Sequence, residues 1–275
     1  LKSVSEFLKG VSKVKVTTYH PNGKTASEGI FIDQLKDGKW QYFSEKGVLL
    51  SVENYKMGKK NGDFITYSTD GYKLKEEHFT NDIQDGVCRT YYEKEELFTE
   101  TNYVNGKLNG ESTSYYPGHI VALKGLYYNG LKTGVWELND TKGKQRRSEE
   151  YDKNGHLLKS YIYLYMGTQA QKINKDQVAY FQKIGETRTT VILKNGNKLE
   201  ITESLTDAIE WVDMLDFLKV TPKLYASADC ILGYKNIDEN TILVHLKPAL
   251  DYEVIAQGDE AQLLRSLLDT SVPEE

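Results

Sequence analysis

Cysteines and long apolar runs are scarce in this sequence. Its 275 residues include two cysteines, Cys88 and Cys230, which lie in different halves of the chain. Two thiols so far apart make no disulfide framework and cannot hold a zinc ion by themselves. No apolar run approaches the ~20 residues of a membrane-spanning helix. With 27% charged and 39% hydrophobic residues, the composition is typical of globular proteins.

A secretory signal is not visible either, yet the sequence begins at Leu1 rather than at a methionine. If a leader has been removed before Leu1, an exported, periplasmic or cell-surface location is favoured, and otherwise a cytoplasmic one. The sequence leaves the compartment open.

Motifs of enzyme chemistry are missing as well. The sequence contains no His-Glu-x-x-His, Gly-x-Ser-x-Gly or Cys-x-x-Cys motif, no Walker loop and no dinucleotide fingerprint. The histidines are isolated from one another, and paired carboxylates such as Glu76-Glu77 are typical of solvated charged faces. We therefore predict no enzyme, with no catalytic residue, no metal site and no cofactor. Residues distant in sequence could still assemble a dispersed site, which is the least favoured interpretation.

Charge is distributed unevenly along the chain. Residues 1–160 carry 24 basic and 22 acidic residues, whereas residues 161–275 carry 11 basic and 18 acidic residues, a net charge of −7. The C-terminal part would repel a phosphate backbone. Binding to nucleic acid is disfavoured, and the charge does not indicate a membrane surface, although such a contact is left open.

What the sequence does contain is an internal repeat of 24 residues. We call its five equally spaced markers the repeat glycines: Gly38, Gly62, Gly86, Gly110 and Gly134. Seven residues before each stands an aromatic residue: Phe31, Tyr55, Phe79, Tyr103 and Tyr127. Such a period indicates one supersecondary unit stacked repeatedly. Each period holds two strand-like and two turn-like segments, which predicts an antiparallel β-meander.

The repeat glycines are predicted to be structural. They fall near segments such as Gly58–Gly62, which we interpret as tight turns between strands. We expect Gly62, Gly86 and Gly110 to adopt a positive φ, or to lie where a side chain would clash.

Two segments carry a family resemblance. Residues 127–136 (Tyr-Tyr-Asn-Gly-Leu-Lys-Thr-Gly-Val-Trp) and residues 103–110 (Tyr-Val-Asn-Gly-Lys-Leu-Asn-Gly) resemble the MORN repeat, in particular its bacterial variant. The resemblance covers about residues 14–158. It implies an elongated antiparallel meander that binds other proteins, and some bacterial relatives are described as antitoxin-like.

A second aromatic series marks the candidate binding residues. Phe43, Tyr67, Tyr91 and Tyr115 lie three residues beyond the positions of Trp40 and Phe64 in each repeat. In a regular strand that offset places them on the opposite face. Either a bulge rotates them back, or aromatic residues line both faces. In the second case Tyr67, Tyr91 and Tyr115 are predicted to form a partner-binding stripe.

The repeat ends before the last third of the chain. Residues 159–166 are predicted to be a buried strand, and the polar residues 168–177 a linker. Strands are then expected at 178–183, 187–194 and 197–202, followed by a helix capped by Ser204. Shorter strands follow at 217–220, 229–234, 241–247 and 252–256, before a final helix from Asp259. We place a repeat array at residues 1–166 and a small α+β domain at residues 167–275.

This order of elements faintly resembles the LytTR DNA-binding domain, so a LytTR-like topology is one option. The basic and polar residues with which that family contacts DNA are missing: Thr221-Pro222-Lys223 follows the 217–220 strand, and Val254-Ile255-Ala256 replaces a Ser-Arg pair. The DNA-binding activity is therefore not carried over.

These observations favour a mainly β, non-enzymatic scaffold whose repeat sheet binds a protein partner of unknown identity. The alternatives are a degenerate LytTR-type transcription regulator and an antitoxin-like protein. The oligomeric state is not determined by the sequence.

Overall fold

The computed structural model describes residues 2–7, 13–212 and 216–269. The protein is mainly β, with a long antiparallel meander and a small α+β region, as predicted. It divides into two compact units. The N-terminal unit comprises residues 1–145 and 150–158, and the C-terminal unit comprises residues 146–149 and 159–275. The domain boundary placed after residue 166 stays a prediction, because compactness alone does not show which part folds by itself.

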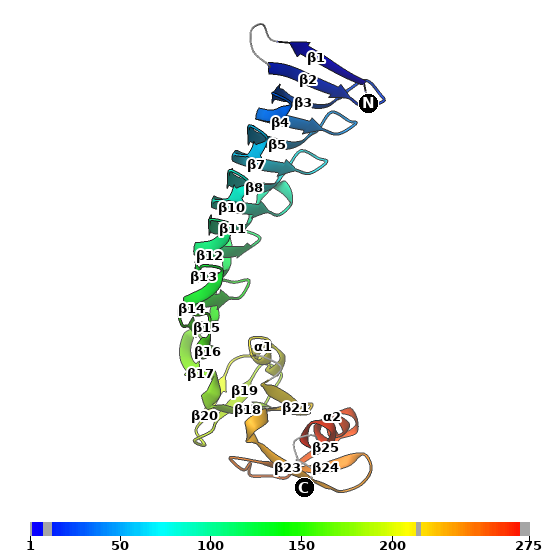
Figure 1. The fold of residues 1–275 in the computed structure, drawn as a ribbon. Coiled ribbons are helices and arrows are strands. Elements are labelled where there is room, and N and C mark those ends of the chain that lie inside the picture. Colours follow the sequence, from blue (N-terminus) through cyan, green and yellow to red (C-terminus); the bar gives the residue numbers. More distant parts are fainter. Residues whose placement is uncertain (1, 8–12, 213–215, 270–275) are drawn as a thin grey trace. The chain divides into compact units, whose positions relative to one another are not determined.

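The N-terminal unit is a meander in which each main strand pairs antiparallel with the next (Figure 1). Its strands are β1 (Lys2–Phe7), β2 (Lys13–Tyr19), β3 (Thr25–Ile32), β4 (Leu35–Phe43), β5 (Leu49–Lys56), β6 (Lys59–Lys60), β7 (Gly62–Tyr67), β8 (Lys73–Thr80), β9 (Ile83–Gln84), β10 (Gly86–Tyr91), β11 (Leu97–Val104), β12 (Lys107–Tyr116), β13 (Ile120–Tyr128) and β14 (Leu131–Asn139). A 3-10 turn, η1 (Glu93–Glu95), precedes β11, and β15 (Gln145–Tyr151) follows β14.

One of the two turns in each repeat is a two-residue hairpin loop. Asn105 and Gly106 have φ of 50° and 76°, and Asn129 and Gly130 have φ of 51° and 88°. Two consecutive positive φ values are typical of the type I′ turn, whose twist matches that of the flanking strands. The amide of Gly106 donates to the carbonyl of Gln84, and that of Gly130 to the carbonyl of Leu108, both at 2.8 Å. These bonds join each turn to the turn one repeat earlier.

The repeat glycines lie in β-bulges rather than in the turns where the sequence placed them. All five have a positive φ: 69° at Gly38, 109° at Gly62, 106° at Gly86, 102° at Gly110 and 66° at Gly134. In β4 the pairing changes from Asp37↔Ile30 to Gln41↔Glu28, so three residues beginning at Gly38 face the single residue Gly29. A bulge needs a residue that tolerates positive φ, which explains why glycine recurs at this position.

The C-terminal unit contains a hairpin that the sequence analysis missed. Strand β16 (Leu157–Met166), which extends from residue 157 of the other unit, pairs with β17 (Gln169–Asn174) from Tyr161↔Asn174 to Met166↔Gln169. The linker predicted over 168–177 is therefore wrong. Its polar residues form a strand because the β16 backbone supplies their hydrogen bonds, whatever their hydrophobicity.

Two further sheets complete the C-terminal unit. The five-stranded sheet has the order β20 (Lys198–Ile201), β19 (Thr189–Leu193), β18 (Val178–Lys183), β22 (Leu224–Ser227) and β21 (Phe217–Thr221). The three-stranded sheet has the order β23 (Ile231–Asn236), β24 (Thr241–Leu246) and β25 (Val254–Gln257). The helices are α1 (Leu205–Ile209) and α2 (Gly258–Asp269), with 3-10 turns η2 (Lys175–Gln177) and η3 (Ala228–Cys230). Strand β22 was not predicted, because four residues give too short a pattern.

The buried side chains of the C-terminal unit form two clusters. One gathers Tyr180, Val220, Leu224 and Ile242 with α2, and the other gathers Phe181, Ile201 and Phe217 with α1. Ile162 and Leu164 of β16, 2% and 3% exposed, belong to the second cluster. The burial predicted for this strand is confirmed for Ile162, Leu164 and Tyr165, whereas Tyr161 and Tyr163 are half-buried and Met166 is exposed. Across the described ranges, no helix is long and apolar enough to span a membrane.

Candidate binding surface of the repeat sheet

The three candidate tyrosines follow a second bulge that recurs in every repeat. The pairing shifts between Thr66 and Tyr67, between Thr90 and Tyr91, and again before Tyr115. At Tyr91 the partner of Thr90 is Thr99 and that of Tyr91 is Leu97, so one residue of β11 is left over. In each repeat one residue has no partner on the facing strand and is the extra residue of the bulge. These left-over residues are Ala26, Leu50, Leu74, Phe98 and Ala122. Their equal spacing shows that the bulge belongs to the repeat.

Tyr91 has the most polar surroundings of the three. Its hydroxyl donates to the carboxylate of Glu76 at 2.6 Å, and the ammonium of Lys73 lies 5.5 Å from its ring centre. Lys73 also pairs with Glu76 at 2.6 Å. Burial, followed by the Glu76 carboxylate, raises the pKa of Tyr91. Burial disfavours the charge on Glu76, but hydrogen bonds from Lys73 and Tyr91 lower its pKa overall. Tyr91 is thus a neutral donor held by an ionised carboxylate.

The other two tyrosines are half-buried as well. Tyr67 is the cross-strand neighbour of Lys73. The ring of Tyr115 is tilted against His119, with 6.3 Å between ring centres, and its backbone carbonyl accepts a hydrogen bond from the Tyr92 hydroxyl at 2.8 Å. Each of the three tyrosines therefore keeps part of its surface accessible. That they bind a partner stays a prediction.

Aromatic residues line both faces of the sheet. Arg89 and Ile65 are both cross-strand neighbours of Glu76 and share its face, whereas Phe64 is paired with the adjacent Glu77. Consecutive strand residues point to opposite faces, so Tyr91, bonded to Glu76, lies opposite Phe64. We call the side of Phe64 the ring face and the side of Tyr91 the tyrosine face. Of the two alternatives, the second holds for Tyr91: a bulge is present, but its extra residue, Phe98, lies on β11, and Tyr91 stays on the face opposite Phe64.

The ring face is the core of the N-terminal unit. Trp40, Phe64 and Trp136 are 3%, 8% and 1% exposed. Each packs edge-on against a neighbouring aromatic residue, for example Phe31 on Trp40 with ring centres 4.8 Å apart. This burial removes these three rings from water, whereas Phe31, Tyr55, Phe79, Tyr103 and Tyr127 of the same face are half-buried.

The tyrosine face carries charged groups and a shallow hollow. The hollow has a volume of about 300 Å³ and is lined by Asp63, Ile65, Glu76, Glu77, His78, Gly86, Val87 and Arg89. The Nδ1 atom of His78 lies 2.7 Å from a carboxylate oxygen of Asp63, and Arg89 pairs with Glu100 at 2.5 Å. The residues that line the hollow include no serine, threonine or cysteine that could act as a nucleophile beside His78.

The residues that the structure describes include no group of three or more His, Cys, Asp or Glu side chains that could hold a metal ion. Cys88 and Cys230 are free and buried. Burial is the main cause that raises the pKa of both thiols. A buried thiol with a raised pKa is a poor nucleophile.

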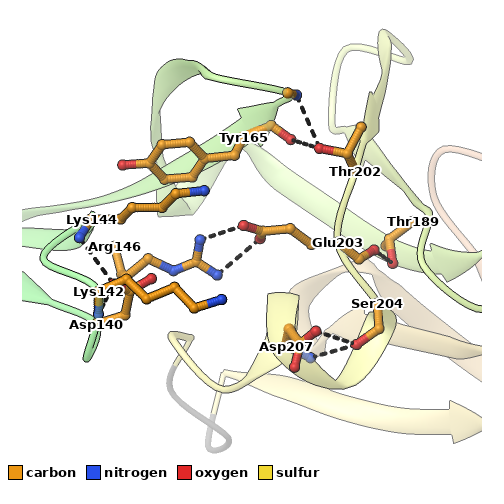
Figure 2. A network of polar contacts seen from close by, with 11 residues as sticks. Asp140, Lys142, Lys144, Arg146, Tyr165, Thr189, Thr202, Glu203, Ser204 and Asp207 are labelled. Atoms are coloured by element: carbon orange, nitrogen blue, oxygen red, sulfur yellow. Dashed lines mark hydrogen bonds and ion pairs between the residues drawn. The ribbon is translucent and has the colours of Figure 1, made fainter.

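A buried ion pair in the C-terminal unit escaped the sequence analysis. The guanidinium of Arg146 donates to both carboxylate oxygens of Glu203, one bond measuring 2.9 Å (Figure 2). The guanidinium also lies 5.4 Å from the Tyr165 ring centre and 5.7 Å from that of Trp211. The carbonyl of Glu203 accepts from the Thr189 hydroxyl at 3.0 Å. The two charges are 57 residues apart, so no local pattern could reveal the pair.

The repeats agree with a known family. Residues 14–33, 36–57 and 84–105 match the model of the MORN repeat variant. The chain carries MORN-variant repeats. No curated protein matches it.

A solved structure is similar to part of the chain. It is described as a "LytTr DNA-binding domain" of a Bacillus cereus protein, and it has 15% sequence identity over 39% of this chain and 95% of that one. Its TM-score is 0.33, so the likeness carries no argument about function.

Proposed function

We propose that this protein is a non-enzymatic scaffold whose MORN-variant sheet binds another protein through the tyrosine face. The observation that carries the proposal is the difference between the two faces. Trp40, Phe64 and Trp136 of the ring face are buried as core, whereas Tyr67, Tyr91 and Tyr115 recur at repeat spacing and are half-buried. Tyrosine in such a row buries a large area on binding at a low cost in side-chain entropy.

The charged groups around Tyr91 support a protein partner. Lys73, Glu76, Arg89 and Glu100 present both signs of charge within one part of the face. A mixed polar surface with an aromatic centre is typical of protein–protein interfaces, in which the aromatic residues contribute most of the affinity. A nucleic-acid partner would instead need an excess of basic side chains.

The test replaces Tyr67, Tyr91 and Tyr115 together with serine. We expect capture of the native partner from the source organism to be lost while the folded sheet remains, because the ring-face core is untouched. A matched control replaces Leu74, Phe98 and Ala122, the left-over bulge residues, with serine. Loss of folding in the tyrosine variant, measured by circular dichroism, would show that these rings are core. Unchanged capture with intact folding would place the binding surface elsewhere.

A further inference from the structure

Three repeats place a lysine over the rings of the ring face. Each ammonium lies over the aromatic residue four positions later and the one nineteen positions later. The distances from Nζ to the ring centres are 4.9 and 4.7 Å for Lys36 over Trp40 and Tyr55, 4.9 and 4.6 Å for Lys60 over Phe64 and Phe79, and 4.7 and 5.2 Å for Lys132 over Trp136 and Tyr151. In these three repeats, the position of Lys36, Lys60 and Lys132 therefore holds a cation over a pair of aromatic rings.

Two consecutive repeats lack that cation. Gln84 and Leu108 stand where the other repeats have lysine, and Cys88 and Ser112 stand where they have the first ring. The second ring is retained in both, as Tyr103 and Tyr127. In the part of the chain that the structure describes, no lysine or arginine lies over either ring, unlike their equivalents Tyr55, Phe79 and Tyr151.

The ring face around Tyr103 is small and mostly uncharged, whereas Tyr127 packs edge-on against Trp136, with ring centres 4.8 Å apart, and is the cross-strand neighbour of Lys132. The ring face here carries Cys88, Thr90, Thr99, Thr101, Ser112 and Ser114. Thr90 and Thr99 share a hydrogen bond of 2.5 Å, and the Gln84 amide donates to Glu77 at 3.3 Å. Lys75 acts electrostatically on Tyr103, but its ammonium is paired with Glu77 at 2.9 Å. An incoming cation would therefore displace no ammonium from Tyr103, and beside Tyr127 the ammonium of Lys132 lies over Trp136 and Tyr151 instead.

We propose that Tyr103 and Tyr127 form a pair of cation sites that receive two basic side chains of a partner peptide. The two tyrosines belong to β11 and β13, which are separated by β12, so they lie about 10 Å apart. In a polyproline II segment, residues i and i+3 point to the same side and are about 9.3 Å apart. The occupant that fits is a proline-rich segment with arginine or lysine at i and i+3, whose cations take the places that Lys36, Lys60 and Lys132 take elsewhere.

This site lies on the ring face and goes beyond the proposed function, which concerns the tyrosine face. An experiment can therefore refute the cation sites without refuting the proposed function of the tyrosine face, and the reverse. The variant in which Tyr67, Tyr91 and Tyr115 are serine should bind the basic peptide like the unaltered protein.

The experiment places a lysine at each of the two positions, 84 and 108, where the other repeats have one. The full chain is titrated calorimetrically with a proline-rich nine-residue peptide carrying two arginines three positions apart, and with the same peptide carrying glutamines. We expect binding of the arginine peptide alone, weakened at least tenfold in the double variant Gln84→Lys, Leu108→Lys. The control Val87→Lys, Thr113→Lys adds the same charge on the tyrosine face and should change the affinity less than twofold.

A second pair of variants guards against misfolding. Replacing Tyr103 and Tyr127 with leucine should abolish binding, whereas phenylalanine at both positions should retain it, because the ring and not the hydroxyl attracts the cation. The proposal is overturned if the glutamine peptide binds equally well, if neither peptide binds, or if a folded lysine double variant binds as the unaltered protein does.

Discussion

The ring of Trp40 occupies the space in which a side chain at Gly29 would lie. The same relationship joins Trp136 and Gly125, and neither glycine has a positive φ. A Cβ at either glycine would fall inside the indole. Where the ring is smaller or absent, the residue eleven positions earlier is larger: it is Glu53 for Phe64, Glu77 for Cys88 and Thr101 for Ser112. Glycine therefore stands at this position in the two repeats whose ring is a tryptophan, and larger residues stand there in the others.

Replacing Gly125 with alanine should destabilise the sheet, because Trp136 must leave a position in which it is 1% exposed. We expect a loss of about 1–3 kcal/mol, the usual range for overpacking. Denaturant unfolding measures it. Gly185→Ala is the control, since Gly185 has an ordinary φ and its nearest neighbour would be 4.0 Å from the new Cβ. Equal effects at the two glycines would contradict the account.

Replacing Gly86 with valine tests the bulge. Its φ is 106°, a conformation that side-chain-bearing residues rarely adopt. Strain should lower the free energy of unfolding by about 1–3 kcal/mol. Val87→Ala, at the next position, should cost less, because that residue needs no special backbone. A valine variant as stable as the unaltered protein would show that the bulge relaxes.

Breaking the Arg146–Glu203 pair should be costly. The two side chains are 6% and 14% exposed, so Glu203→Gln removes one carboxylate charge from beside a buried guanidinium. Loss of one partner of a buried pair typically costs about 3–5 kcal/mol. The double variant Arg146→Met, Glu203→Met removes both charges and should regain part of that loss. A double variant less stable than either single variant would contradict this interpretation.

Whether a C-terminal fragment folds by itself should depend on the residue at which the fragment begins. A fragment starting at residue 167 lacks Arg146, Ile162 and Leu164, all of which belong to the C-terminal unit. We expect a fragment of residues 140–275 to unfold cooperatively in denaturant and a fragment of residues 167–275 not to do so. Amide dispersion in NMR spectra gives the same distinction. Cooperative unfolding of the shorter fragment would support the boundary after residue 166.

Cys230 should make stability fall at alkaline pH. Burial, followed by the Asp229 carboxylate, raises the pKa of its thiol from 9.0 to about 11. The folded state holds this proton more tightly than the unfolded state, so the contribution is present below pH 9 and is lost as the pH rises through about 11. Comparing Cys230→Ala with the unaltered protein by denaturation at pH 8 and pH 10.5 isolates this loss. An identical pH dependence of the two proteins would refute it.

The sequence by itself determined the repeat, the hairpin turns and the need for positive φ at the repeat glycines. These features are local, because turn chemistry and strand alternation depend on residues a few positions apart. It also located most strands of the C-terminal unit and the cap of α1, where the Ser204 hydroxyl accepts from the amide of Asp207 at 3.1 Å.

Only the tertiary structure decided which aromatic row is core and which is accessible. The sequence left open whether a bulge rotates Tyr91 back, and the pairing shows that the extra residue, Phe98, lies on β11, so Tyr91 keeps the regular alternation of β10. Strand β17 exists because β16 pairs with its polar residues, and Glu203 is held by an arginine 57 residues away. Such contacts join residues that are remote along the chain, so no short window of sequence contains both partners.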